Sequence, residues 1–260
     1  LAKQDFAQAW NGKFVAFCFV VTLLSISLVT LMSMALKDKS QRGEFIQGAY
    51  RSSAAILGIA FITNIYGNSG MAPLMIIGSV PLYNVMAVIV LSFTKPGQNG
   101  MSPALIKKTL KGIITNPIIL GILSGALWSV LRLPMPTILS KTVSSLGGLT
   151  TPLGLMAMGA AFNWSEAKSG MGPAFAASFM KLIGLCTLFL PVAVLLGFRE
   201  AELIAILVML GSSTTVSSDV MARNMGHSGV LSSSIVAITT LGSAFSLTFW
   251  LYVLKTLALI

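Results

Sequence analysis

Charged side chains are scarce in this sequence. Asp, Glu, Lys and Arg together make up 9% of the 260 residues, against about 25% in an ordinary soluble domain. Hydrophobic residues make up 55%, and the mean hydropathy is +0.87. A surface with so few charges would not stay dissolved in water, so the composition indicates a protein that lies in a lipid bilayer. A chain of 260 residues can form about eight spans of ~20 residues with short loops.

Residues that build catalytic centres are also rare. The chain has one His and two Cys. Cys18 and Cys186 both lie in apolar stretches, where a small core residue is the usual role. The sequence contains no metal-ligand spacing, no phosphate-binding loop and no nucleophile–base pattern. We therefore expect neither an enzyme nor a metal or cofactor site.

Acidic residues are fewer than basic ones, 7 against 17, which gives a net charge of +10. No basic helix or interleaving of basic and aromatic residues is present, so we expect no nucleic-acid partner. In a membrane protein, Lys and Arg instead accumulate in cytoplasmic loops. The net charge is therefore a prediction about orientation in the membrane.

Eight apolar segments predict an all-α polytopic membrane protein. They run over 14–36, 47–67, 72–94, 113–131, 137–162, 173–197, 201–222 and 230–257. We expect the fifth to be interrupted at Gly147, Gly148 and Pro152. The longest polar connection, 95–111, is rich in Pro and Gly, which predicts a loop.

Loop charge predicts the orientation of these segments. The side reached by odd-numbered segments carries ten basic residues: Lys37, Lys39, Arg42, Arg51, Lys95, Lys107, Lys108, Lys111, Lys168 and Arg223. The other side carries six: Lys3, Lys13, Arg132, Lys141, Arg199 and Lys255. The richer side is expected to be cytoplasmic, with both ends of the chain outside.

Residues 211–219, GSSTTVSSD, carry hydroxyls at six of nine positions inside an apolar segment. Such a run is costly in a membrane unless it lines a cavity or a broken helix. Residues 51–58, RSSAAILG, have a similar character in the second segment, and two interrupted segments in corresponding places indicate a transporter binding site. The candidate ligands are Ser52, Ser53, Gly58, Ser212, Ser213, Thr214 and Thr215. The alternative is that these hydroxyls bond to carbonyls of their own helix and pack against neighbours.

Four further polar residues lie within or beside the apolar segments. Asp219 is a candidate for proton or cation coupling, or it pairs with Arg223 one helical turn later. Lys181 could attract an anion or pair with Asp219, or it could extend to the membrane interface. Asn84 is a candidate ligand, because a buried amide needs hydrogen-bond partners.

The order of several motifs resembles the auxin efflux carrier family, whose bacterial members include malonate-type permeases. The motifs are 43–53 (GEFIQGAYRSS), 83–88 (YNVMAV), 115–121 (TNPIILG), 151–160 (TPLGLMAMGA), 181–182 with Pro191, and 211–226. Family members often carry Asn and Pro in the first broken helix, where Ser53 and Ala60 stand here. They usually carry Pro in the second, where Ser213 stands. Without proline, the breaks must come from glycine, from competing hydroxyls or from the partner segment.

The resemblance implies ten helices in two inverted five-helix repeats that cross at broken helices four and nine. This chain, which begins at Leu1 rather than Met, would supply helices three to ten and lack the first two. Residues 1–94 would be the remainder of the first repeat, 95–111 a cytoplasmic connecting loop, and 112–260 the second repeat. A mobile unit, 14–94 with 173–257, would move against an incomplete scaffold.

We therefore expect a secondary transporter in the inner or plasma membrane that moves a small organic anion, a carboxylate, by alternating access. No cofactor is expected, and the coupling ion could be a proton or sodium. One alternative is a sodium-coupled symporter of the bile-acid type, because the hydroxyl-rich segments could supply sodium ligands. A membrane enzyme or a non-transporting receptor is the other alternative. The sequence leaves the oligomeric state open, with a homodimer as one option.

Overall fold

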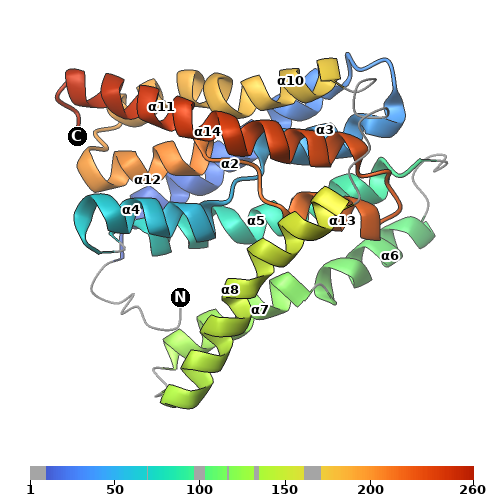
Figure 1. Cartoon of the computed structure of the whole chain (residues 1–260), viewed down its shortest axis with the longest axis horizontal. Helices are drawn as coiled ribbons and strands as arrows, with labels where there is room; N and C mark the ends of the chain where they lie inside the picture. The colour runs from blue at the N-terminus through green and yellow to red at the C-terminus, as the bar shows by residue number, and fades with distance from the viewer. Residues whose placement is uncertain (1–9, 69, 97–102, 116, 132–134, 161–170) are drawn as a thin grey trace.

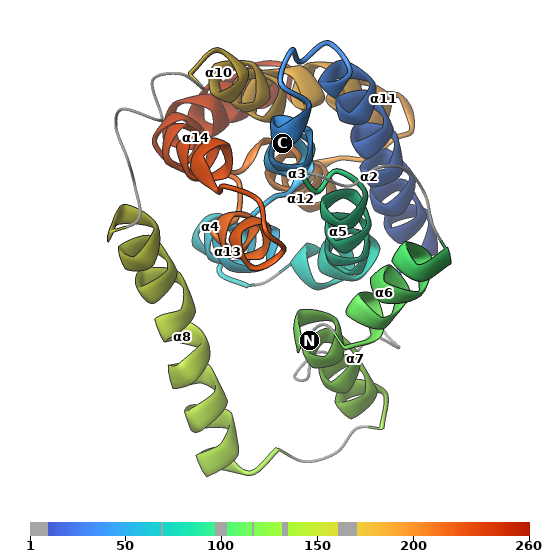
Figure 2. The ribbon, with the colours of Figure 1, turned by 90° about the vertical axis from the view of Figure 1, so that its right-hand side faces the viewer.

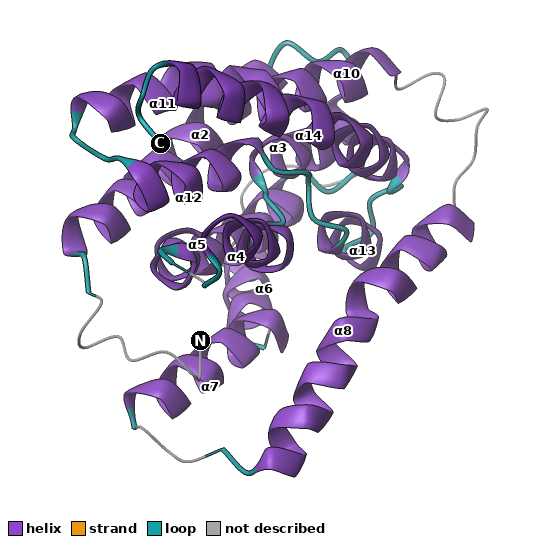
Figure 3. Cartoon of the chain, turned by 60° about the vertical axis from the view of Figure 1, so that its left-hand side comes forward, coloured by secondary structure: helices purple, strands orange, loops and turns teal. Residues whose placement is uncertain are grey.

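The computed structural model describes residues 10–68, 70–96, 103–115, 117–131, 135–160 and 171–260. Within these ranges every regular element is a helix and no strand occurs (Figure 3). The helices are α2 (Gly12–Ser33), η1 (Lys39–Gln41), α3 (Arg42–Tyr50), η2 (Ala54–Gly58), α4 (Ile59–Tyr66), α5 (Ala72–Phe93), α6 (Pro103–Ile114), α7 (Pro117–Val130), α8 (Thr137–Ala160), α10 (Met171–Phe179), η3 (Met180–Gly184), α11 (Leu185–Leu195), α12 (Glu200–Gly211), α13 (Ser217–Asn224) and α14 (Val230–Thr256).

Four helical stretches of the described chain are long and apolar enough to cross a membrane. They are Gly12–Ser33, Ala72–Phe93, Met171–Leu195 and Val230–Thr256. These stretches coincide with the first, third, sixth and eighth predicted segments. The prediction of an all-helical, multi-pass membrane protein is confirmed at this level.

The second and seventh predicted segments are both interrupted, as expected. In the second segment, helix α3 ends at Tyr50, and an extended stretch separates it from the π-helical turn η2. In the seventh segment, helix α12 ends at Gly211, and helix α13 begins only at Ser217. Each segment therefore consists of two short helices joined by irregular backbone.

The helices that lead into the two breaks lie at the centre of the molecule. Every residue of α3 from 43 to 50 and of α12 from 203 to 211 is buried. Helices α2 and α5 pack on one side of this centre, and α10 packs against α14 and α3 (Figures 1 and 2). Most of the irregular backbone therefore lies inside protein, and a membrane protein tolerates such backbone where it is buried in protein or lines a water-filled cavity.

A carboxylate fastens α3 to the long helix α14. Helix α14 starts after Gly229, whose φ of 76° is in the left-handed region open to glycine. Glu44 of α3 is buried and accepts hydrogen bonds from the backbone N–H groups of Gly229 (3.0 Å) and Ser232 (2.9 Å). A negative charge at a helix N-terminus is stabilising, so Glu44 fixes the start of α14 against α3.

Two expectations for the middle of the chain are wrong. Helix α6 begins at Pro103, inside the predicted loop 95–111, because proline is favoured in a first helical turn and the following residues have amphipathic spacing. Helix α8 runs unbroken through Gly147, Gly148 and Pro152, since helices of membrane proteins tolerate Gly and Pro. Helix α8 stands apart from the central helices (Figure 2).

Candidate functional site

The two breaks meet and bond to each other. The backbone N–H of Ser53 in the first break donates to the carbonyl of Ser213 in the second, at 2.9 Å. The Ser52 hydroxyl donates to the carbonyl of Val208 at 3.2 Å and also bonds the hydroxyl of Ser212. The structure therefore brings together the two hydroxyl-rich stretches that the sequence singles out.

Thr214 connects the second break to two other helices. Its hydroxyl donates to the carbonyl of Gly48 in α3 at 2.6 Å, and its N–H donates to the Thr239 hydroxyl of α14 at 3.0 Å. Both Thr214 and Ser52 thus bond across the crossing. The alternative in which they bond within their own helix is wrong for these two residues. Hydroxyls outside the two stretches, such as those of Ser234 and Thr240 in α14, donate to carbonyls four residues earlier in their own helix.

Gly58 permits the close approach of the first segment to α12. It ends the π-helical turn, in which its N–H donates to the carbonyl of Ser53 at 3.4 Å. A Cβ on Gly58 would lie 3.0 Å from the Cγ1 of Val208 and 3.3 Å from the Cε of Met75. The predicted role of Gly58 in the site is therefore one of shape, because it offers no side-chain ligand.

Arg51, which the loop count assigns to the cytoplasmic side, is buried at the crossing, with 3% of its surface exposed. Its guanidinium donates to the Oδ1 of Asn84 (2.9 Å), the Oγ of Ser217 (3.1 Å) and the Oε1 of Gln47 (3.4 Å), and it contacts the Sδ of Met221 (3.0 Å). Its Nε is buried and has no hydrogen-bond partner among the described residues. Arg51 forms no ion pair with any of the described residues. The ion pair found among them joins Asp219 and Arg223.

Asn84 completes the polar surroundings of this guanidinium. Its Oδ1 accepts from Arg51, and its Nδ2 donates to the carbonyl of Val80 at 2.8 Å. Ser53, Thr215 and Ser217 are only half-buried, and the hydroxyls of Thr215 and Ser217 are 3.1 Å apart. Ser217, one of these half-buried residues, lies directly beside the guanidinium.

Lys181 lies at the crossing as well and is fully buried. Its Nζ donates to carbonyls at the ends of α3 and α12, with the shortest contact, 2.7 Å, to Leu210. The alternatives of pairing with Asp219 and of extension to the membrane interface are both wrong. The carbonyls at two helix ends attract the ammonium inward.

Asp219 and Arg223 form the predicted pair, with 3.0 Å between the Nε of Arg223 and the Oδ2 of Asp219. Asp219 is buried and also accepts a hydrogen bond from the Ser232 hydroxyl at 2.9 Å. The carboxylate thus links α13 to α14. It does not contact Arg51 or Lys181.

A family model described as "Membrane transport protein" matches residues 3–251. The chain belongs to this family, the auxin efflux carrier family. No protein of the curated set matches it. The family is one of multi-pass membrane transporters.

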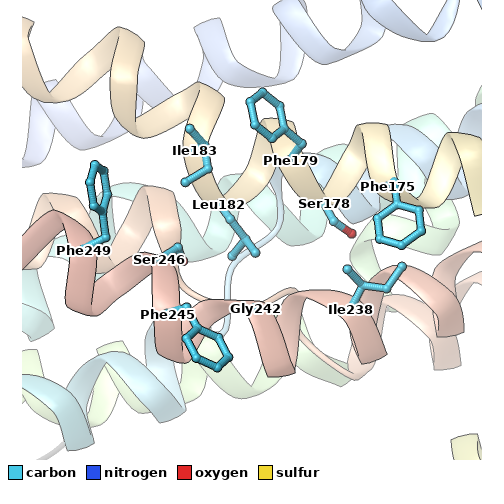
Figure 4. A pocket seen from close by; sticks show the side chains of 10 residues that line it. All are labelled: Phe175, Ser178, Phe179, Leu182, Ile183, Ile238, Gly242, Phe245, Ser246 and Phe249. Atoms are coloured by element: carbon cyan, nitrogen blue, oxygen red, sulfur yellow. The ribbon is translucent and has the colours of Figure 1, made fainter.

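A separate groove of about 390 Å³ lies between α10, η3 and α14 of the carrier. Its lining is Phe175, Ser178, Phe179, Leu182, Ile183, Ile238, Gly242, Phe245, Ser246 and Phe249 (Figure 4). None of the side chains predicted for the site belongs to it, and two serines are its only polar side chains. The groove suits lipid chains better than a charged solute.

Arg51 is the site residue that sequence reasoning missed. The count of loop charges treats each Lys or Arg near a segment end as a loop residue and so places Arg51 in a loop. It lies inside the second apolar segment, immediately before Ser52 and Ser53. An arginine within a membrane segment is by default a candidate for function, and this signal could have identified it.

Proposed function

We propose that this carrier is a secondary active transporter that moves a small organic anion, a carboxylate, across the inner or plasma membrane by alternating access. The proposal fits the chemistry of the crossing, where a fixed positive charge lies beside amide and hydroxyl groups. A malonate-like dicarboxylate is one member of this substrate class.

Arg51 is the observation that supports an anionic substrate most directly. A buried guanidinium without an acidic partner is costly, and a charged residue within a membrane segment commonly marks a substrate or ion pathway. The guanidinium matches the two oxygens of a carboxylate, with which it forms short, charge-assisted bonds. A carboxylate at Nε and the adjacent Nη2 would take up the free donor and displace the bond to Ser217.

The order of elements supports an inverted repeat and a mobile unit. A span, an interrupted segment and a span occur as α2, α3–α4 and α5, and again as α10–α11, α12–α13 and α14. If the eight predicted segments alternate across the membrane, the first and the sixth run in opposite directions, as inverted repeats require. Within this proposal, α2–α5 and α10–α14 move together against a scaffold that includes α7 and α8.

Transport is tested by reconstitution of the full-length protein in liposomes. Uptake of labelled mono- and dicarboxylates should be saturable and should exceed uptake by empty liposomes and by liposomes with a neutral analogue. A receptor would bind a carboxylate without flux. Binding without flux, or flux of neutral analogues at the same rate, would contradict the proposal.

A further inference from the structure

The span α10–η3–α11 contains a π-helical turn at its centre, Met180–Gly184. Such turns add one residue to a helix and are frequent at functional sites. The carbonyl of Leu182 within this turn is satisfied from another helix, by the Nε1 of Trp250 at 3.2 Å. The turn places Lys181 on the inner face of the span, where no part of it is exposed.

The ammonium of Lys181 closes the C-terminal ends of both helices that lead into the breaks. It donates to the carbonyls of Leu210 (2.7 Å) and Met209 (3.3 Å) in the last turn of α12, and to that of Tyr50 (3.4 Å), the last residue of α3. The last carbonyls of a helix lack partners in that helix and carry partial negative charge. An ammonium has three donors, and here each of the three contacts joins it to such a carbonyl.

Carbonyls at unwound backbone and at C-terminal ends of half-helices are the groups that coordinate sodium in transporters with broken helices. We propose that Lys181 is the resident cation of this crossing. Its ammonium fills the position that a bound sodium ion would take, so the crossing holds itself together without sodium. If Lys181 replaces sodium, transport should not need sodium, and this consequence rests on the proposed function. The cation site itself does not rest on it.

The two buried cations of the crossing then have different tasks. Lys181 is surrounded by carbonyls that satisfy its three donors, so it positions the two breaks and does not bind substrate. The Nε of Arg51 has no partner among the described residues, and the half-buried Ser217 lies beside the guanidinium, so Arg51 is available to an anion. Under this proposal, transport should proceed in the absence of sodium, unlike transport by a sodium-coupled symporter.

Replacement of Lys181 by a smaller side chain should create a site for a monovalent cation, and thermal unfolding of the full-length protein in detergent measures it. For the wild type, exchange of sodium for choline at equal ionic strength should leave the melting temperature unchanged. Lys181→Ala should melt at a lower temperature, and methylammonium chloride should restore at least half of the loss, because a cation that binds the folded state stabilises it by mass action. Choline, too large for the vacated position, should restore nothing. Lys255→Ala, at an exposed lysine of α14, is the matched control and should respond to neither cation.

Lys181→Met, of similar length but without charge, covers the case in which Lys181→Ala does not fold. It should also melt below the wild type. A saturable rise of the wild-type melting temperature in sodium, or a Lys181→Met protein as stable as the wild type, would overturn the proposal. If carboxylate flux is absent but methylammonium restores the melting temperature of Lys181→Ala, the proposed transport function is contradicted and the cation site is supported. Carboxylate flux without a rescue by methylammonium would contradict the cation site alone.

Discussion

The two breaks of this carrier use different means to open a helix. The first break follows Tyr50 and carries a charge, Arg51, and it returns to helix directly through a π-helical turn. The second break follows Gly211, remains irregular over a longer stretch and carries hydroxyls. The first break therefore contains a buried charge, whereas the second contains only neutral residues.

Neither break contains proline, and each is held open by the other segment. The Gly48 carbonyl near the end of α3 receives the hydroxyl of Thr214, and the Ser213 carbonyl receives the N–H of Ser53. Gln47 of α3 likewise donates to the carbonyl of Ser218 at 2.6 Å. Backbone groups that helix hydrogen bonds would otherwise satisfy are thus satisfied across the crossing. This makes the breaks mutually dependent.

The largest expected effect is on transport, and it comes from removal of the charge of the first break. Arg51→Gln should lower carboxylate transport by about 10- to 100-fold, because a hydrogen bond to a charged group contributes about 1.5–3 kcal/mol. Arg51→Lys should recover only part, since an ammonium cannot offer two parallel N–H groups. Uptake into liposomes measures both.

The matched control for Arg51 is Arg199→Gln, at an exposed arginine. It should transport at the wild-type rate. Equal losses in the two variants, or full activity of Arg51→Gln, would contradict the assignment of the anion to the first break.

Proline substitutions compare the backbone of the two breaks. Ser53→Pro should destabilise the protein by about 3 kcal/mol, because it removes the N–H that bonds to Ser213. Ser213→Pro should change stability by less than about 1 kcal/mol. The N–H of Ser213 bonds to none of the described residues, and Ser212 has φ −73° and ψ 162°, a conformation favoured before proline. Chemical denaturation in detergent gives both values, and a reversed order would show that the second break is the more constrained.

Thr214→Val tests whether the breaks depend on each other. Loss of the hydrogen bond to Gly48 should lower the free energy of unfolding by about 1–2 kcal/mol. Thr187→Val is the matched control, because the Thr187 hydroxyl is exposed and donates to Ile183 in its own helix. That control should change stability by less than about 0.5 kcal/mol. Similar values for the two threonines would argue against mutual dependence.

The smallest effect is expected at Asp219, beyond the second break. Asp219→Asn should lower stability by about 1 kcal/mol or less, because Arg223 is about one-third exposed and water screens the pair. The pH dependence of transport should stay as in the wild type, since the carboxylate is engaged by Arg223 and Ser232. A flattened pH profile would instead support the proton-coupling role. Asp38→Asn, at an exposed carboxylate, is the control.

The sequence predicted what depends on composition and local pattern. The apolar spans, the two interrupted segments and the pair of Asp219 with Arg223, one helical turn apart, all follow from spacing along the chain. The inward position of Lys181 and the burial of Arg51 could not be predicted from spacing along the chain. Both depend on which carbonyls, amides and hydroxyls a distant segment brings to the side chain, and on a π-helical turn that has no clear sequence signal.

A structure of the full-length protein with a transported carboxylate bound tests the anion site most directly. We predict that the carboxylate oxygens lie within hydrogen-bond distance of the Nε and Nη2 of Arg51, between Ser53 and Ser217, and that Lys181 keeps its three carbonyl contacts. A carboxylate bound away from Arg51, with the guanidinium still held only by Gln47, Asn84 and Ser217, would contradict the proposal.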